Sequence, residues 1–170
     1  MSSTAQHDVI DRLAGIAADA PVAALRRQKP DLVAFAQGSY DALLEPAEPG
    51  DVSLLERHAI AYRVGLLTGF DMVAAWHERR LRELGANDDL VAAIADFPAS
   101  EDLAPRLAAL LRQTDLVTTA PGTAAAENIA ALHAAGLTPA AVVTVGQLIG
   151  FLAYQIRAIA VARAFGEAAQ

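Results

Sequence analysis

Apolar positions recur at the three- and four-residue spacing of α-helices along most of the chain, and no segment shows the two-residue alternation of a β-strand. Ile60, Val64 and Leu67, for example, fall on one stripe of a helix. Glycine and proline interrupt this pattern at intervals, as they do between helices. The pattern predicts an all-α protein that folds as a bundle of about seven or eight helices.

The ends of the predicted helices follow from capping and helix-breaking residues. Pro21, Pro30 and Pro139 each suit the first turn of a helix, and Ser53 with Glu56 forms a capping box. The first predicted helices cover 7–18, 21–27, 30–44, 54–68 and 70–84, with a proline-rich loop at 45–51. The others are a short segment capped by Asn87 or Asp88, a segment that Ser100 caps and that runs to about 118, a segment that ends at Gly136, and a last helix that Thr138 caps.

The last predicted helix is unusually apolar. Its residues 140–156 form a run of 17 without a charged side chain, which is at the short limit for a membrane span. Gln147, Tyr154 and Gln155 interrupt the run, and Arg157 follows it. We therefore expect a buried central helix and no membrane association.

Composition narrows the possible functions. The 170 residues suit one domain, and a hydrophobic fraction of 54% favours closely packed helices with further apolar surface buried between subunits. The net charge of −7 without a basic stripe argues against nucleic-acid binding. Because the chain has no cysteine, thiolate metal sites, iron–sulfur clusters and cysteine nucleophiles are excluded. The N-terminus has no secretory signal pattern, so we expect a cytoplasmic protein.

Two segments point to a known family. The stretch SLLERHAIAYRVGLLTGFDMVAAWHERRLRELG at 53–85 resembles the core motif of the carboxymuconolactone decarboxylase/alkylhydroperoxidase-D (AhpD-like) family, and 115–167 is similar to the C-terminal half of its peroxidase-related members. The resemblance implies an AhpD-like helical bundle in one domain, 1–170, with an N-terminal helical extension at 1–50 and the family-like core at 53–167. It also implies a homo-oligomer, a trimer or a hexamer, of a cysteine-less branch.

The family's redox motif is degenerate in this chain. Redox-active members have a glutamate followed twelve residues later by Cys-x-x-Cys-x-x-x-His, and these four positions fall on His58, Phe70, Val73 and His77. Only His77 matches. A thiol peroxidase needs an attacking thiolate and a resolving thiol, so the resemblance supports the fold and disfavours peroxidase chemistry. Decarboxylase members keep the histidine but carry a glutamate at the position of Val73, so that version is incomplete too.

A polar cluster is the best candidate site. His58 and Tyr62 lie one turn apart, and in a fold like the family's their face meets that of His77. An imidazole suits proton transfer near neutral pH, so these three are the candidate catalytic residues. The alternative interpretation, which the sequence favours slightly, is a histidine pair that holds two helices together. Candidate pocket-lining residues are Phe70, Val73, Gln147 and Tyr154.

Three functions remain open at this stage. The first is thiol-independent acid–base chemistry on a small carboxylate or lactone, with His77 as the acid or base. The second is a non-catalytic role in binding a small-molecule ligand or an active paralogue, and the third is the disfavoured alkylhydroperoxidase reaction. We expect no cofactor and no metal, since no carboxylate lies one turn from His77 on its helix to complete a metal site.

Overall fold

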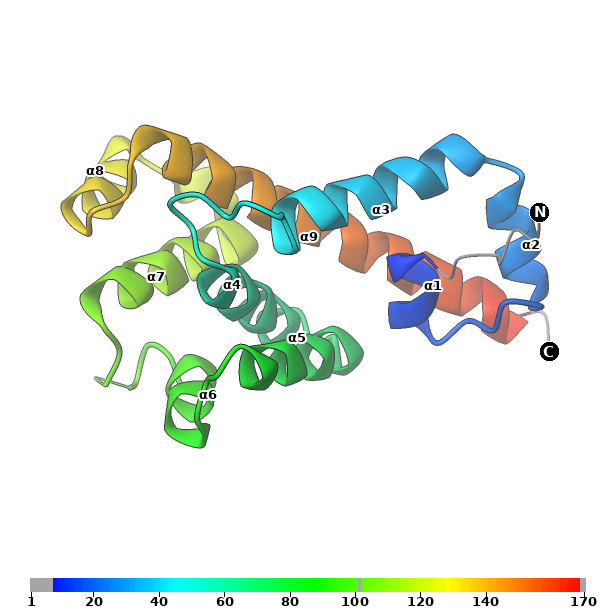
Figure 1. Ribbon diagram of the computed structural model, residues 1–170, viewed down its shortest axis with the longest axis horizontal. Helices are drawn as coiled ribbons and strands as arrows, with labels where there is room; N and C mark the ends of the chain where they lie inside the picture. Colours follow the sequence, from blue (N-terminus) through cyan, green and yellow to red (C-terminus); the bar gives the residue numbers. More distant parts are fainter. Residues whose placement is uncertain (1–7, 101, 169–170) are drawn as a thin grey trace.

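The computed structural model describes residues 8–100 and 102–168, and all regular secondary structure within them is helical. These residues form nine α-helices and one 3₁₀ turn (Figure 1). The all-α prediction is confirmed, and the count exceeds the predicted seven or eight. The elements are α1 (Val9–Ala14), α2 (Pro21–Arg27), α3 (Pro30–Leu44), α4 (Leu54–Leu67), α5 (Asp71–Glu83), α6 (Asp88–Ala95), α7 (Pro105–Thr119), η1 (Pro121–Thr123), α8 (Ala126–Ala134) and α9 (Pro139–Ala168).

Helix α9 is the long axis around which the other helices are arranged. In Figure 1 it runs along most of the molecule, with α8 beside its first turns and α1 and α2 beside its last ones. It contacts α1, α3 and α4 along its length, and α4 in turn packs most extensively against α5 and α7. Helices α1, α2 and α3 therefore lie on one side of α9, and the α4–α5 hairpin lies on another.

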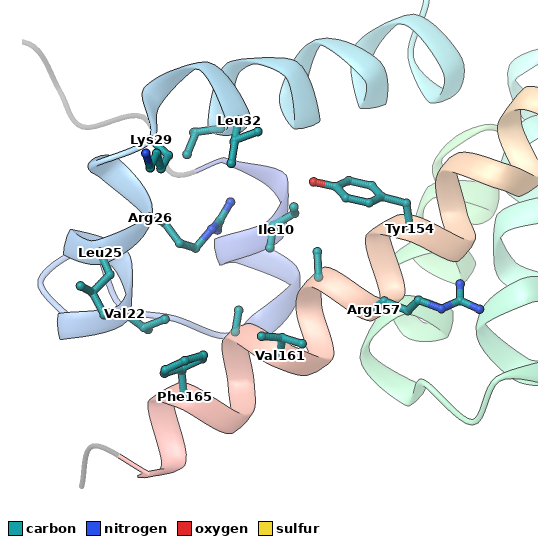
Figure 2. A pocket seen from close by; sticks show the side chains of 13 residues that line it. Ile10, Val22, Leu25, Arg26, Lys29, Leu32, Tyr154, Arg157, Val161 and Phe165 are labelled. Carbon is teal, nitrogen blue, oxygen red and sulfur yellow. The ribbon is translucent and has the colours of Figure 1, made fainter.

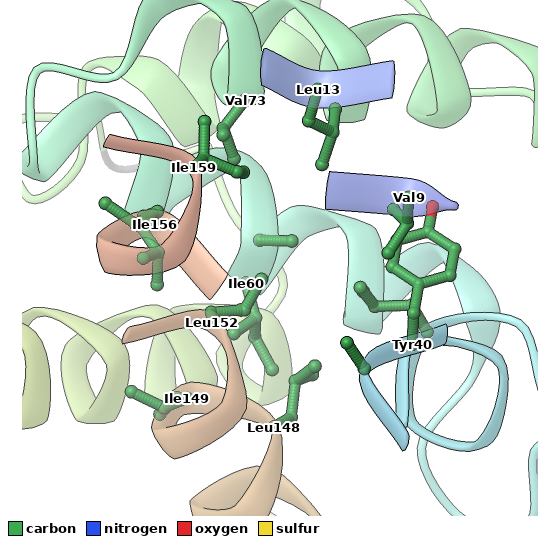
Figure 3. Packing of buried hydrophobic residues seen from close by; sticks show 14 of the residues in the cluster. Val9, Leu13, Tyr40, Ile60, Val73, Leu148, Ile149, Leu152, Ile156 and Ile159 are labelled. Atoms are coloured by element: carbon green, nitrogen blue, oxygen red, sulfur yellow. The ribbon is translucent and has the colours of Figure 1, made fainter. Parts of the chain in front are cut away.

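The core consists of two clusters of buried apolar side chains. The larger one follows α9, where Leu152 packs near Ile60 of α4, and Ile159 lies with Leu13 and Val73 where α1, α5 and α9 meet (Figure 3). The smaller one lies between α4, α5, α6 and α7. Its fully buried large side chains are Leu81, Ile94 and Leu111.

The α4–α5 hairpin is fixed at both ends by local sequence. The predicted capping box is present, with the Ser53 backbone N–H donating to Glu56 Oε2 at 2.8 Å and the Glu56 N–H donating to Ser53 Oγ at 3.2 Å. Gly69 closes the turn at φ 67°, a left-handed conformation that glycine adopts without strain. A Cβ on Gly65 would lie 2.7 Å from the Ala74 backbone nitrogen, so this glycine permits the close approach of the two helices.

Two predicted helix boundaries are wrong. The first helix ends at Ala14, because Gly15 takes a left-handed conformation at φ 67° and its N–H donates to Arg12 O, closing the helix early. The seventh helix begins at Pro105, and the Ser100 hydroxyl accepts only from the Asp102 N–H at 3.4 Å, so it does not cap that helix. The remaining boundaries agree with the prediction to within about two residues, apart from the predicted start at His7, which lies outside the described residues.

Helix α9 is buried on one face only. It is long and apolar enough to cross a membrane by length and composition, but 39% of its most apolar window is buried inside the protein. The predicted central helix is thus confirmed for the face that carries Leu148, Leu152 and Ile159. Val143 on the opposite face is 60% exposed. The homo-oligomer stays a prediction.

Candidate functional site

The two histidines singled out in the sequence meet in the interior of the protein. His58 projects from α4 and His77 from α5, and neither side chain has any solvent exposure. Their Nδ1 atoms lie 2.9 Å apart, and the ring centroids are separated by 5.1 Å at an interplanar angle of 37°. The predicted proximity of His58 and His77 is therefore present as a direct nitrogen–nitrogen hydrogen bond.

A carboxylate extends this pair at its outer end. Glu45, the residue that follows α3, places Oε1 3.2 Å from His58 Nε2. The ring N–H is not aligned well enough with that oxygen for a full hydrogen bond, so the contact is chiefly electrostatic. Arg80 holds the same carboxylate through both oxygens, at 2.8 Å and 2.9 Å. Glu45, His58 and His77 thus form one continuous array, the Glu45–His58–His77 array.

Arg57 determines where Glu45 lies. This arginine is 4% exposed, and its guanidinium donates to three backbone carbonyls: Leu43 at 2.6 Å, Pro49 at 2.8 Å and Val52 at 2.8 Å. These three hydrogen bonds fold the proline-rich loop after α3 back over the start of α4. Glu45 is brought to the histidines in this way, although the sequence predicted only a loop at its position.

The carboxylate assigns the protons of the two imidazoles. An ionised Glu45 accepts and cannot donate, so it favours a proton on His58 Nε2. His58 Nδ1 is then a bare acceptor and His77 Nδ1 carries the proton of the 2.9 Å bond. The array ends in His77 Nε2 as a lone pair, and this buried atom has no hydrogen-bond partner among the described residues.

Burial keeps both rings neutral. Desolvation, followed by the influence of Arg80, outweighs the attraction of Glu45 and lowers the pKa of His58 to about 4. For His77, desolvation first and then the neighbouring His58 and Arg80 hold the pKa well below 6.5. At neutral pH the array is therefore an ionised carboxylate followed by two uncharged imidazoles.

Tyr62 does not join the histidines. It is buried in the smaller core cluster, and burial, followed by Glu78, raises its pKa. The other charged groups that act on its hydroxyl are Arg82 and Asp96. The polar neighbours of Tyr62 therefore differ from those of the array.

The residues at the family's two cysteine positions lie one turn apart, with the Val73 N–H donating to the Phe70 carbonyl at 3.0 Å, but they differ in burial. Val73 is fully buried in the larger core cluster. Phe70 is half-buried and lines a shallow cavity of ≈ 210 Å³ with Ala160 and Arg163 near the end of α9. These two positions carry apolar contacts where redox-active members place their reactive thiols.

The two pocket-lining candidates from the last helix also separate. Gln147 is exposed, whereas Tyr154 lines a cavity between α9 and the N-terminal helices. Gln155, also on α9, was not among the predicted candidates, although it is fully buried. Neither the oxygen nor the nitrogen of its side-chain amide has a hydrogen-bond partner in the described part of the chain. In the sequence, Gln155 only interrupts an uncharged, apolar run, and this did not predict that its side chain is buried without a partner.

The described residues, 8–100 and 102–168, contain no group of three or more histidine, aspartate or glutamate side chains that could hold a metal ion. In the array, the Nδ1 atoms of both histidines are already bonded to each other. The chemistry available to these side chains is therefore hydrogen bonding and proton transfer.

Comparison with known proteins identifies the fold. The structure is similar to the alkylhydroperoxidase AhpD core, an uncharacterized peroxidase-related protein from Ralstonia eutropha JMP134, with a TM-score of 0.68, 20% identity, and coverage of 76% of this chain and 67% of that one. It is also similar to an uncharacterized peroxidase-related protein from Silicibacter sp. TM1040, with a TM-score of 0.67, 18% identity, and coverage of 78% and 68%. The chain has the AhpD-like fold.

A third structure extends the AhpD-like likeness over nearly the whole chain. It is debrominase Bmp8, solved as a cysteine-to-alanine variant in complex with 2,3,4-tribromopyrrole, with a TM-score of 0.72, 15% identity, and coverage of 95% of this chain and 87% of that one. No family model matches the sequence, and no curated protein matches it either. At these identities the likeness concerns the fold, and the function has to be argued from the residues present.

Proposed function

We propose that this AhpD-like protein performs thiol-independent acid–base chemistry, with His77 Nε2 as the base. The observation that carries the proposal is that His77 Nε2 is buried at the inner end of the Glu45–His58–His77 array without a hydrogen-bond partner among residues 8–100 and 102–168. Buried polar atoms are almost always hydrogen-bonded, and exceptions are often found where a protein acts on a ligand. An unpaired lone pair at this place can accept a proton from a bound molecule.

The array gives that proton a destination. When His77 Nε2 takes up a proton, His77 Nδ1 can pass its own proton to His58 Nδ1. His58 Nε2, 3.2 Å from Glu45 Oε1, can pass one to Glu45 once its N–H turns into line with that oxygen. Both imidazoles then end neutral and the carboxyl is protonated, so no charged imidazole persists in the interior, where it would be strongly disfavoured.

The surroundings of His77 suggest a small substrate. His77 is fully buried, and Val73, one turn before it on α5, is buried as well. The substrate class that we propose is a compact carboxylic acid or lactone with an acidic C–H next to its carbonyl. Proton removal would give the enolate, and the protonated base would return the proton to the same carbon or to a neighbouring position.

A second candidate is a non-catalytic role in which the histidines join α4 to α5. The observation that favours it is that both side chains have no solvent exposure. In that case the protein would bind a small molecule elsewhere or act beside an active paralogue. The peroxidase reaction suggested by the names of the structural neighbours is not proposed, because this chain has no cysteine.

Deuterium exchange tests the proposal without knowledge of the product. Small lactones and 2-oxo carboxylic acids would be incubated with the protein in D₂O, and exchange at the carbon next to the carbonyl would be followed by proton NMR. We expect His77→Gln to slow exchange by about 10²-fold or more, the scale of a lost general base. Glu45→Gln should slow it less, because His77 Nε2 remains in place.

His133→Gln is the matched control, since His133 is exposed and its ring nitrogen contacts only the Leu137 carbonyl, at 2.9 Å. It should leave exchange unchanged. If no compound exchanges faster with the wild type than with His77→Gln, the non-catalytic candidate replaces the proposal.

A further inference from the structure

A second feature lies outside the array, between the N-terminal helices and the end of α9. It is a cavity of ≈ 550 Å³ whose walls come from α1, α2, α3 and the C-terminal half of α9, here called the α9 cavity (Figure 2). This volume is in the range of small-molecule sites, about 300–1,000 Å³. None of its lining residues belongs to the Glu45–His58–His77 array.

The walls of the α9 cavity are mainly apolar and unusually open to solvent. Leu25 and Leu32 are 53% and 63% exposed, and Val161 and Phe165 are each 58% exposed. Together they account for much of the large apolar surface exposed in the described part of the chain. Such a concentration marks a place where an apolar partner is expected.

The charged groups of the α9 cavity are all cationic. They are Arg26, Lys29 and Arg157, and in the part of the chain that the structure describes no acidic side chain lines the cavity. Arg26 forms an ion pair with Asp8, at 3.0 Å, and another with Asp11. Lys29 and Arg157 form no ion pair within residues 8–100 and 102–168. At Lys29 and Arg157, the α9 cavity of this protein, whose net charge is −7, is thus lined by positive charge that no described carboxylate pairs.

Polar and apolar groups occupy different parts of the α9 cavity. Figure 2 shows the Tyr154 side chain directed into the space between α3 and α9, with its hydroxyl toward the part where Arg26 and Leu32 lie. Val22 and Phe165 lie at the opposite end, beside the last turns of α9. One end therefore offers hydrogen-bond donors and positive charge, and the other offers apolar contact.

We propose that the α9 cavity binds an amphiphile with one carboxylate head and a hydrocarbon tail, such as a medium-chain fatty acid. The carboxylate would lie near Lys29, Arg26 and the Tyr154 hydroxyl, where charge-assisted hydrogen bonds are available. The tail would cover the exposed side chains toward Phe165. This binding site does not depend on the acid–base function proposed for His77.

Decanoate is the probe, and decanol is its uncharged counterpart. Both would be titrated into the full chain by calorimetry, below the concentration at which decanoate forms micelles. We expect decanoate to bind at least about tenfold more tightly than decanol, the scale of one charge-assisted hydrogen bond. Equal affinities, or no binding of either compound, would overturn the proposal.

Two variants locate the site. Ala158 lines the α9 cavity from α9, so Ala158→Trp should fill it and abolish binding of both probes. Ala140→Trp makes the same substitution at an exposed position of the same helix, outside the cavity, and should leave binding unchanged. If Ala158→Trp binds decanoate as the wild type does, the carboxylate site is elsewhere and the proposal is wrong.

The charge requirement is tested separately from the shape. The variant Lys29→Gln removes a cation beside the proposed carboxylate, so it should weaken decanoate binding by about tenfold and leave decanol binding unaffected. Light scattering on all variants distinguishes the competing occupant. If the wild type is an oligomer that Ala158→Trp alone converts to monomers, the α9 cavity is an interface between copies, and the amphiphile proposal fails. His77→Gln should bind decanoate normally, which separates this result from the acid–base proposal.

Discussion

The Glu45–His58–His77 array and the α9 cavity lie in the same bundle, but their polar groups have opposite surroundings. In the array, two fully buried rings and a carboxylate contact one another, and His77 Nε2 has neither a hydrogen bond nor a charged partner among the described residues. In the cavity, Lys29 and Arg157 are near solvent and the neighbouring apolar side chains are uncovered. Burial in the first region fixes proton positions, whereas exposure in the second leaves charge and apolar surface available for binding.

Because of this difference, substitutions in the two regions should affect different properties of the protein. Changes in the array should alter the free energy of unfolding and its dependence on pH, because buried polar groups are expensive to leave unpaired. Changes in the α9 cavity should alter binding with little effect on stability, because its side chains are already exposed.

The largest expected effect comes from Arg57→Met. The change removes the donors to the Leu43, Pro49 and Val52 carbonyls and releases the loop that positions Glu45. Leaving buried acceptors unpaired costs about 1–3 kcal/mol each, so we expect the free energy of unfolding in urea to fall by about 3–5 kcal/mol. The exposed Arg112→Met should change it by less than about 0.5 kcal/mol. Equal effects for the two variants would show that Arg57 does not hold the loop.

The second effect is on the pH dependence of stability. Both histidines have folded-state pKa values below 6.5, with that of His58 lowered to about 4. The unfolded chain therefore binds more protons than the folded one below pH 6.5, and the stability present above that pH is lost as the pH falls toward 4 and below. Each histidine contributes a slope of up to about 1.4 kcal/mol per pH unit between those values.

Urea unfolding at several pH values between 7 and 4.5 measures this slope. His77→Gln should reduce it, because one of the two buried titrating groups is gone. His133→Gln removes an exposed histidine and should leave the slope unchanged. A wild-type stability that stays flat from pH 7 to pH 4.5 would contradict the burial argument for both rings.

A smaller effect tests the packing that brings the two histidines together. Gly65→Ala places a Cβ 2.7 Å from the Ala74 backbone nitrogen, so α4 and α5 must move apart. Overpacking of this kind costs about 1–3 kcal/mol in the free energy of unfolding. Gly146→Ala is the control on α9, where nothing lies within 4 Å of the added carbon, and it should stabilise the protein by about 0.5–1 kcal/mol. Both variants would be compared by urea unfolding, and a tolerated Gly65→Ala would show that the hairpin has slack at this contact.

The fold was predictable from sequence because its signals are local. The capping box at Ser53, the left-handed Gly69 and the Thr138–Pro139 start of α9 each determine a boundary within one turn of chain. The two wrong boundaries lie where the first helix closes at Gly15, before the predicted end at 18, and where α7 begins at Pro105, after the predicted cap at Ser100. In each case the residue that closes or opens the helix lay close to the one chosen.

The candidate site was only half predictable, for a physical reason. His58 and His77 lie on facing helices of one hairpin, so helical spacing and the family resemblance could bring them together. Glu45 reaches them because Arg57 binds three carbonyls at the end of α3 and in the loop before α4, and because Arg80 holds its carboxylate; no periodic pattern encodes such contacts. Tyr62 shares a helix face with His58 yet lies among Glu78, Arg82 and Asp96, because a one-turn spacing does not determine which neighbour a long side chain meets.

The smallest expected effect is that of Tyr154→Phe, a variant that separates an effect on binding from an effect on stability. Tyr154 is 50% exposed, so removal of its hydroxyl should change the free energy of unfolding by less than about 0.5 kcal/mol. If the hydroxyl donates to a bound carboxylate, the affinity for decanoate should fall by about two- to tenfold, the range of one hydrogen bond, while that for decanol stays the same. Calorimetry and urea unfolding on one preparation measure both quantities. A loss of stability without a change in affinity would mean that Tyr154 supports the packing of α9 against α3 and does not contact a ligand in the α9 cavity.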